Sequence, residues 1–180
     1  MKLLVVVDYQ NDFVNGSLGY PGAEKLEAPI LKKVQQYVLD GGEVVFTLDT
    51  HASNYLDTEE GRNLPVPHCI KGTKGHRLYG NVERISKFAS AIFEKGTFGC
   101  EALSEYIRDG RYDTIELCGL VSNICVLANA VIAKTAAPYA HIIVDARCTG
   151  CADPEMNEKA LDLLESFHVE VTGRKGRDVK

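Results

Sequence analysis

Three side chains in the sequence have the types needed for nucleophilic attack on a carbonyl carbon. Asp8 ends the apolar run KLLVVVD, Lys95 ends ASAIFEK, and Cys125 follows GLVSNI at the predicted start of a helix. A thiolate attacks, a carboxylate can accept its proton, and an ammonium can stabilise the negative charges. Backbone N–H groups in the first turn of a helix favour a thiolate and can form an oxyanion hole. The same residues also allow a simpler interpretation, an Asp8–Lys95 ion pair beside an inert core thiol.

A second group of side chains has the composition of a metal site. Asp49 and His51 are two positions apart on a predicted extended segment, so their side chains lie on the same side of the chain. His68 and Glu60, from the long segment that follows, could complete the set. Imidazole and carboxylate ligands without a thiolate suit zinc, iron or manganese.

Short β-branched runs alternate with longer amphipathic ones, and this alternation predicts the elements that position these side chains. Strands are expected at residues 2–8, 43–49, 89–95, 113–119, 141–146 and 168–172, and helices at 24–40, 81–88, 100–110, 122–137 and 154–167. The strands are nearly all apolar on both faces, which indicates an α/β fold with a parallel sheet covered on both sides. Ligands of such sheets bind outside the carboxyl ends of the strands, where Asp8, Asp49 and Lys95 are expected. The intervening segment 51–80 has no clear periodicity, and a loop of this length is usually functional.

Length and composition limit the remaining classes of protein. The 180 residues fit a single domain, 1–180, and a formal net charge of −5 argues against a nucleic-acid partner. The apolar run LLVVV is too short for a signal peptide or a membrane span, so we expect no membrane partner and a cytoplasmic protein.

The cysteines do not suggest a disulfide framework. Six cysteines in 180 residues are sparse, and several fall inside apolar segments, which suggests reduced thiols. Cys148 and Cys151 have the spacing of a redox motif, but they are expected in a loop after a strand, and we interpret the spacing as chance. Cys69, beside His68, is interpreted as a small apolar core residue.

Five motifs, VVVDYQNDF, FTLDTHASN, PHCIKGT, FEKGTF and CGLVSNICV, occur in this order over roughly residues 3–172. The ordered set resembles the isochorismatase-like cysteine hydrolases, and within them the nicotinamidases. The resemblance implies a three-layer α/β/α Rossmann-like sandwich with a six-stranded parallel sheet of order 3-2-1-4-5-6. It also implies a catalytic triad of Asp8, Lys95 and Cys125. A cis peptide bond is implied at Leu120–Val121, with an oxyanion hole formed by the N–H groups of Val121 and Cys125.

For the metal, the resemblance implies that Asp49, His51 and His68 bind a divalent ion, with Glu60 where some family members place a fourth ligand. Zinc is expected first, and iron and manganese are the alternatives. In nicotinamidases this ion holds the pyridine nitrogen of nicotinamide and so points the carboxamide at the cysteine.

For the substrate, the resemblance places Phe13 where an aromatic residue packs on the pyridine ring, and Phe98 and Leu120 are further candidates. Many nicotinamidases have a tryptophan shortly before the metal-binding histidine. This chain has no tryptophan and has Leu64–Pro67 there instead. The second wall of the ring pocket is therefore not assigned from the sequence.

We therefore predict a nicotinamidase that hydrolyses nicotinamide to nicotinate and ammonia through a thioester on Cys125. Family members that act on isochorismate lack the cysteine, so Cys125 argues against that activity. The alternative enzyme is a related cysteine amidase for another small amide or ureido compound. The alternative outside enzymes is a non-catalytic metal-binding or interaction protein on the same fold. The sequence leaves the oligomeric state open, a homo-oligomer included.

Overall fold

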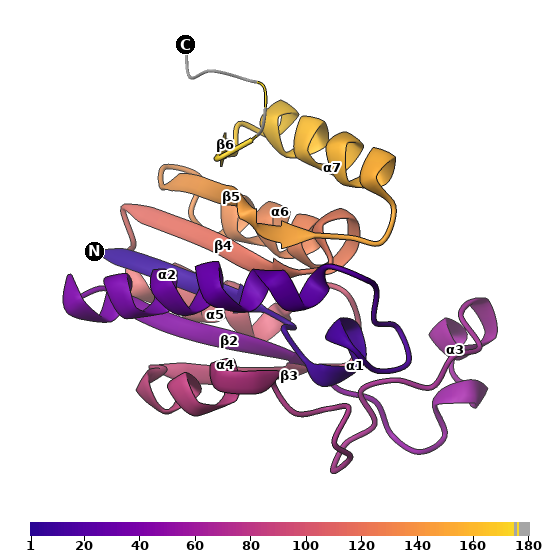
Figure 1. The fold of residues 1–180 in the computed structure, drawn as a ribbon. Helices are drawn as coiled ribbons and strands as arrows, with labels where there is room; N and C mark the ends of the chain where they lie inside the picture. The colour runs from indigo at the N-terminus through magenta and orange to yellow at the C-terminus, as the bar shows by residue number, and fades with distance from the viewer. Residues whose placement is uncertain (175, 177–180) are drawn as a thin grey trace.

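A computed structural model describes residues 1–174 and 176, and this part of the chain contains a six-stranded parallel sheet. The strand order is β3-β2-β1-β4-β5-β6, which confirms the predicted order (Figure 1). Residues 175 and 177–180 of the predicted domain lie outside the described residues. The strands are β1 (Lys2–Val7), β2 (Glu43–Asp49), β3 (Ala91–Lys95), β4 (Thr114–Leu120), β5 (His141–Gly150) and β6 (Glu170–Thr172).

The central strand β1 is apolar on both faces because both faces are covered. Side chains alternate along a strand, so Leu3 and Val5 belong to one core cluster and Leu4 and Val6 to the other. All four residues are fully buried. Burying each such side chain contributes about 1.5–3 kcal/mol relative to leaving it exposed to water, so this run stabilises both faces of the sheet.

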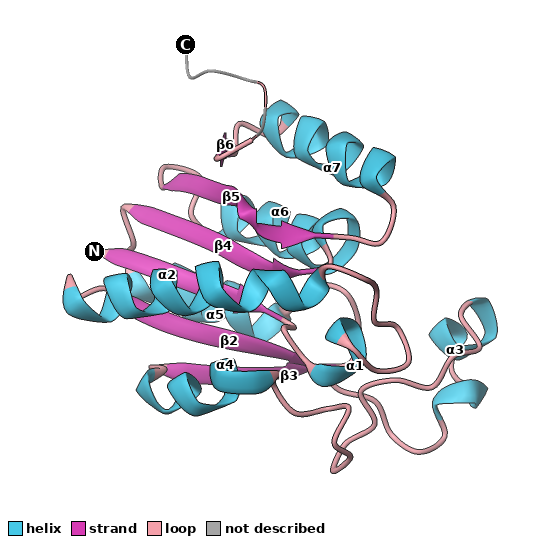
Figure 2. Ribbon diagram, viewed as in Figure 1, coloured by secondary structure: helices cyan, strands magenta, loops and turns pink. Residues whose placement is uncertain are grey.

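Helices form the two outer layers (Figure 2). Helices α2 (Glu27–Leu39) and α4 (Gly80–Ile85) pack on the Leu4 face, while α5 (Glu101–Gly110), α6 (Leu127–Ala136) and α7 (Pro154–Ser166) pack on the Val5 face. These layers confirm the predicted α/β/α sandwich. Within the described residues, no helix combines the length and the apolar character needed to cross a membrane. The shorter helical segments are α1 (Asn11–Val14), η1 (Ala23–Leu26), η2 (Tyr55–Asp57), α3 (Glu59–Asn63), η3 (Ser86–Phe88) and the π-helical turn η4 (Ser122–Val126).

Strand β5 differs most from its predicted range. It continues to Gly150 instead of ending at residue 146. Its register against β4 shifts between Leu117 and Gly119, and parallel pairing then resumes. The irregularity absorbs the extra residues of β5, so the strand reaches the same end of the sheet as its neighbour.

The extension of β5 corrects the prediction for the cysteine pair. Cys148 lies inside the strand and is 2% exposed, so the prediction that it sits in a loop is wrong. Cys151 follows the strand directly and is partly exposed. All six cysteines are free, and Cys69 is buried in the core as expected.

Segment 51–80 contains more secondary structure than its composition suggested. It includes η2 and α3, and α3 lies beyond the end of the sheet to which the strands point (Figure 1). A parallel bridge pairs His51 with Ile70, which returns the end of the segment to the continuation of β2. Segment 51–80 is therefore a folded loop that lies at the carboxyl ends of the strands.

Candidate active site

Asp8, Lys95 and Cys125 come together at the carboxyl ends of the strands. The Nζ atom of Lys95 lies 2.7 Å from Oδ2 of Asp8 and 3.6 Å from Sγ of Cys125. The three residues are buried, with exposed fractions of 0%, 6% and 5% in the same order. The structure thus places a thiol within reach of a cation that is already paired with a carboxylate.

The local backbone explains where the carboxylate and the ammonium lie. Asp8 is the first residue after β1 and has a φ of +44°, and its N–H donates to the carbonyl of Thr47 at 3.1 Å. The Thr47 hydroxyl donates to Oδ1 of Asp8 at 2.6 Å. Lys95 is the last residue of β3, and its ammonium also donates to the carbonyl of Thr97 at 2.9 Å. Each Asp8 oxygen therefore has a partner that fixes its direction.

Cys125 lies in the π-helical turn η4, between β4 and α6, instead of in a regular first α-helical turn. The Leu120–Val121 peptide bond before this turn is cis, as predicted. Gly119 has a φ of +108°, and a Cβ atom there would lie 1.9 Å from the carbonyl oxygen of Val7. Only glycine fits this close approach of β4 to β1, which starts the turn that presents the thiol.

Asn129 connects this turn to the neighbouring loop. Its Nδ2 atom donates to the carbonyl of Cys125 at 2.8 Å and to the carbonyl of Phe98 at 3.1 Å. Its Oδ1 atom accepts the N–H of Cys100 at 3.0 Å. This buried amide therefore holds the cysteine turn and the loop after Lys95 in one fixed arrangement.

Burial governs the charge states of the three groups. It raises the pKa of the Cys125 thiol well above its usual value, and the nearby Asp8 raises it further while Lys95 opposes both. Burial likewise raises the pKa of Asp8, against the opposing effect of Lys95. For Lys95, burial lowers the pKa, but the negative charges of Asp8 and Asp49 and the hydrogen bond to Asp8 raise it more. The resting site therefore favours a neutral thiol, in place of the thiolate expected at a helix N-terminus, beside a carboxylate that is an unusually strong base.

The four predicted metal ligands converge at the adjacent strand end. Their ligand atoms all lie within 4.8 Å of one another. The Nε2 atoms of His51 and His68 lie 3.0 and 3.3 Å from Oδ2 of Asp49, and 3.7 and 3.6 Å from Oε1 of Glu60. Tetrahedral zinc bonds of ~2.0–2.2 Å hold neighbouring ligands about 3.3–3.6 Å apart, and these four spacings of 3.0–3.7 Å lie close to that range. Two carboxylates and two imidazoles also form a donor set whose negative charge a dication balances.

Hydrogen bonds orient the ligand atoms of this cluster. Nδ1 of His68 lies 2.8 Å from the carbonyl of Val66, so Nδ1 donates its proton there and Nε2 faces the cluster. Burial lowers the pKa of His68, but its bonds to Asp49 and to the Val66 carbonyl raise it above the usual value. Burial raises the pKa of Asp49, whereas the bonds from His51 and His68 and the charge of Lys95 hold it well below its usual range. Asp49 is therefore an anion that is ready to bind a metal ion.

A cavity of about 650 Å³ opens beside the cluster. Of the predicted substrate residues, Phe98 lines it and is 47% exposed. Phe13 and Leu120 are not among the lining residues. The ring of Phe13 lies 5.6 Å from the ring of His68, and Leu120 is fully buried in the α2-side core, so the Leu120 side chain does not reach the cavity. The lining consists of His51, Thr58, Glu59, Glu60, Asn63, Leu64, Gly96, Thr97, Phe98 and Ile124.

Sequence reasoning missed several residues that build this site. Thr47 and Asn129 are polar residues within otherwise apolar segments, VVFTL and LANAVIA, and that contrast was the available signal. Leu64 and Ile124 supply partly exposed apolar walls to the cavity, where no tryptophan is available. The position of Ile124, directly before Cys125, was the signal for that wall.

Comparison with known sequences gives a consistent result. The chain matches the family model described as Isochorismatase domain over residues 2–175. A Bacillus subtilis protein, described as the uncharacterized isochorismatase family protein PncA, is 32% identical over 142 residues, which cover 72% of this chain and 76% of that protein. The nicotinamidase of Saccharomyces cerevisiae is 25% identical over 217 residues, which cover 97% of this chain and 100% of that protein.

Solved structures have the same fold. The nicotinamidase PncA of Bacillus subtilis superposes with a TM-score of 0.83 at 32% identity, over 94% of this chain and 98% of that chain. A pyrazinamidase of Pyrococcus horikoshii, in complex with zinc, has a TM-score of 0.83 at 24% identity, over 95% of this chain and 98% of that chain.

Proposed function

Because the chain belongs to the isochorismatase family, we propose that it is a nicotinamidase, an amidohydrolase that converts nicotinamide and water to nicotinate and ammonia. One observation carries the proposal. The Nζ atom of Lys95 lies 2.7 Å from Asp8, 3.6 Å from Cys125 and 3.4 Å from Asp49, so one ammonium joins the nucleophile to the metal cluster. The nicotinamidases among the similar proteins support the choice of substrate.

The proposed reaction begins with proton transfer from the Cys125 thiol to Asp8. The thiolate attacks the carboxamide carbon, and the N–H groups of Val121 and Cys125 stabilise the oxyanion, each such donor contributing about 3–4 kcal/mol. Asp8 then gives its proton to the leaving nitrogen, and ammonia departs to leave a thioester. Asp8 next accepts a proton from water, the resulting hydroxide attacks the thioester, and nicotinate leaves while the proton returns to the sulfur. Lys95 stabilises the negative charges throughout.

The proposed metal ligands are Asp49, His51, His68 and Glu60, with zinc as the first choice and iron or manganese as alternatives. A bound dication would hold the pyridine nitrogen of the substrate and so orient the carboxamide towards Cys125. The ligand spacing and the zinc complex of the Pyrococcus horikoshii pyrazinamidase support this assignment.

The proposed binding site for the pyridine ring is the cavity beside the cluster. Phe98, Leu64 and Ile124 line it with apolar surface, and His51 and Glu60 bring the cluster to its wall. Phe13 takes part indirectly in this proposal, because its ring packs on His68. We also propose a cytoplasmic location, which the six free cysteines support.

The test is ammonia release from nicotinamide by the full chain, measured with a coupled enzyme assay. Cys125→Ala should lower the rate by about 10⁴-fold or more, since the nucleophile is lost. Removing metal with a chelator should abolish activity, and added zinc should restore it. Ammonia release that persists in Cys125→Ala would refute the proposed chemistry. Hydrolysis of another small amide but not of nicotinamide would favour the related amidase.

A further inference from the structure

The side-chain amide of Gln10 is fully buried and bonded to the backbone of a proposed metal ligand. Its Oε1 atom accepts the N–H of Asp49 at 2.8 Å, and its Nε2 atom donates to the carbonyl of the same residue at 2.8 Å. The second Nε2 hydrogen bond goes to the carbonyl of His76, also at 2.8 Å. The amide therefore binds both backbone polar groups of Asp49 and connects them to the backbone of His76, near the end of segment 51–80.

The geometry of the sheet explains why Asp49 needs this partner. At the end of the β1–β2 ladder, the carbonyl of Thr47 accepts the N–H of Asp8. Alternate residues of a strand direct their peptide groups to the same neighbouring strand, so those of Asp49 face the space where β1 has already ended. The Gln10 amide fills this space as a further strand residue would. Without it, a buried N–H and a buried C=O would lose their partners.

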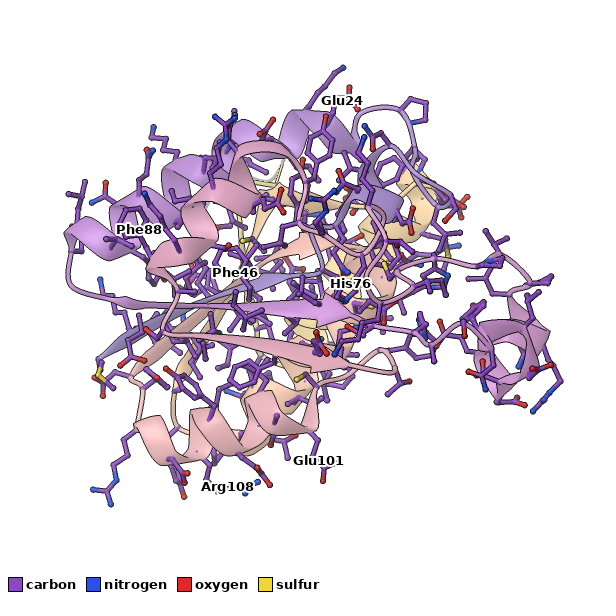
Figure 3. All side chains as sticks on the ribbon, turned by 90° about the horizontal axis from the view of Figure 1, so that it is seen from below. Glu24, Phe46, His76, Phe88, Glu101 and Arg108 are labelled. Carbon is purple, nitrogen blue, oxygen red and sulfur yellow. The ribbon has the colours of Figure 1, made fainter. Side chains whose placement is uncertain are left out.

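Asp12, two residues after Gln10, binds the backbone beside another proposed ligand, His68. Oδ2 of Asp12 accepts the N–H of Cys69 at 2.8 Å, and Cys69 follows His68 directly. The carbonyl of Cys69 in turn accepts the N–H of His51 at 3.0 Å. Figure 3 shows His76, whose carbonyl accepts the second hydrogen bond from Gln10, near the end of the sheet to which the strands point. Phe46 lies farther back within the sheet.

We propose that Gln10 and Asp12 are positioning residues that set the affinity of the cluster for its divalent ion. Gln10 fixes the backbone of Asp49, and Asp12 fixes the backbone next to His68. Neither side chain belongs to the proposed ligand set, and each acts through the ligand backbone that it holds. This inference rests on the metal site of the proposed function. Removing an outer partner of a metal ligand typically weakens metal binding by about 10–100-fold.

The experiment measures zinc affinity of the full chain by competition with a chromogenic chelator. Gln10→Met keeps the length of the side chain and removes its three hydrogen bonds, and we expect zinc to bind about 10–100-fold more weakly. Asn11→Ala is the matched control. Its Nδ2 atom donates to the carbonyls of Lys74, Arg77 and Leu78, so it anchors the same loop without touching a ligand residue. Its zinc affinity should stay within about twofold of wild type.

Two further variants keep the test decisive. If circular dichroism shows that Gln10→Met does not fold, Gln10→Asn replaces it, since it keeps a neutral amide and shortens the side chain by one methylene, which draws the amide away from its backbone partners. Asp12→Ala removes the acceptor for the Cys69 N–H and should weaken zinc binding to a similar degree. Wild-type zinc affinity in a folded Gln10 variant or in Asp12→Ala would overturn the proposed role of that residue. An equal loss of zinc affinity in Asn11→Ala would overturn both roles, because it would show that any anchor of this loop has the same effect.

The outcome separates this inference from the proposed function. Wild-type protein that binds zinc but releases no ammonia from nicotinamide would refute the substrate and leave the positioning role intact. Wild-type protein that binds no zinc would remove the metal site and the inference with it.

Discussion

Lys33 is the cation of a buried charge network on the α2 face of the sheet. Its Nζ atom lies 2.5 Å from Oε1 of Glu116 and 2.9 Å from Oδ2 of Asp145. The Lys33, Glu116 and Asp145 side chains are only 16%, 10% and 2% exposed. Lys33→Met keeps the alkyl chain but leaves two carboxylates without their shared ammonium. Removing one partner of a buried ion pair typically costs about 3–5 kcal/mol of unfolding free energy.

The remaining partners place the expected loss at the lower end of that range. Arg147 still donates to both Asp145 oxygens, at 2.9 and 2.8 Å, and the Tyr37 hydroxyl still donates to Glu116 at 2.8 Å. We therefore expect Lys33→Met to lower the unfolding free energy by about 3 kcal/mol at pH 7. Lys32→Met, at the exposed neighbouring position, is the control and should change it by less than about 0.5 kcal/mol.

The assay is urea unfolding of both variants and wild type over a pH series. For Asp145, burial raises the pKa, but Arg147 and Lys33 lower it to about 2, below the ordinary value of 3.8. Its contribution to stability is therefore complete above pH 3.8 and is lost as the pH falls towards 2. The deficit of Lys33→Met should thus be largest at neutral pH and shrink in acid. A deficit below about 1 kcal/mol at pH 7, or one that does not shrink, would refute the reasoning.

Two further substitutions test the geometry around the thiol. Thr47→Val removes the hydroxyl that donates to Asp8 at 2.6 Å. Because hydrogen bonds to charged groups contribute about 1.5–3 kcal/mol, kcat/KM for amide hydrolysis should fall about 10–100-fold. The acidic limb of its pH profile should move to higher pH, because the Asp8 carboxylate loses a donor that favours its charged form. An unmoved profile would contradict this role. Gly119→Ala places a Cβ atom 1.9 Å from the Val7 carbonyl at a φ of +108°, and thermal melting should show destabilisation well beyond about 1 kcal/mol. Gly41→Ala is its control, since Gly41 also has a positive φ but open space around it, and equal losses in the two variants would contradict the steric argument.

Much of the fold could be predicted because a strand that is buried on both faces of a sheet is apolar at consecutive positions of the sequence. The run LLVVV of β1 is apolar at every position, and the inner strand that it predicts is present. The end of β5 was not predictable in this way. Arg147, Thr149 and Gly150 interrupt the apolar pattern, and the strand continues only because of a register shift opposite Leu117–Gly119. That shift depends on two strands that are distant in the sequence.

The residues of the candidate site were also predictable only in part. Asp8 and Lys95 were predictable because each is a charged residue at the end of an apolar run. Gln10 was not, since its hydrogen-bond partners are backbone groups of Asp49 and His76, which are distant in the sequence and carry no side-chain signal. Leu120 was placed at the substrate by resemblance. A resemblance locates a residue in the chain but does not say which way its side chain points, and here it points into the core.

The order of these residues along the chain has a consequence for biosynthesis. Lys95 lies on β3, and Cys125 follows β4, which pairs with β1 on the opposite side from β2. A nascent chain that ends before β4 already carries Asp8, Lys95 and the proposed metal ligands but lacks Cys125, the proposed nucleophile. In an unfolded chain, Cys125 is an ordinary exposed thiol without a proton acceptor beside it. The proposed site is thus completed only when β4 pairs with β1, so the appearance of activity during refolding would report the formation of this strand pair.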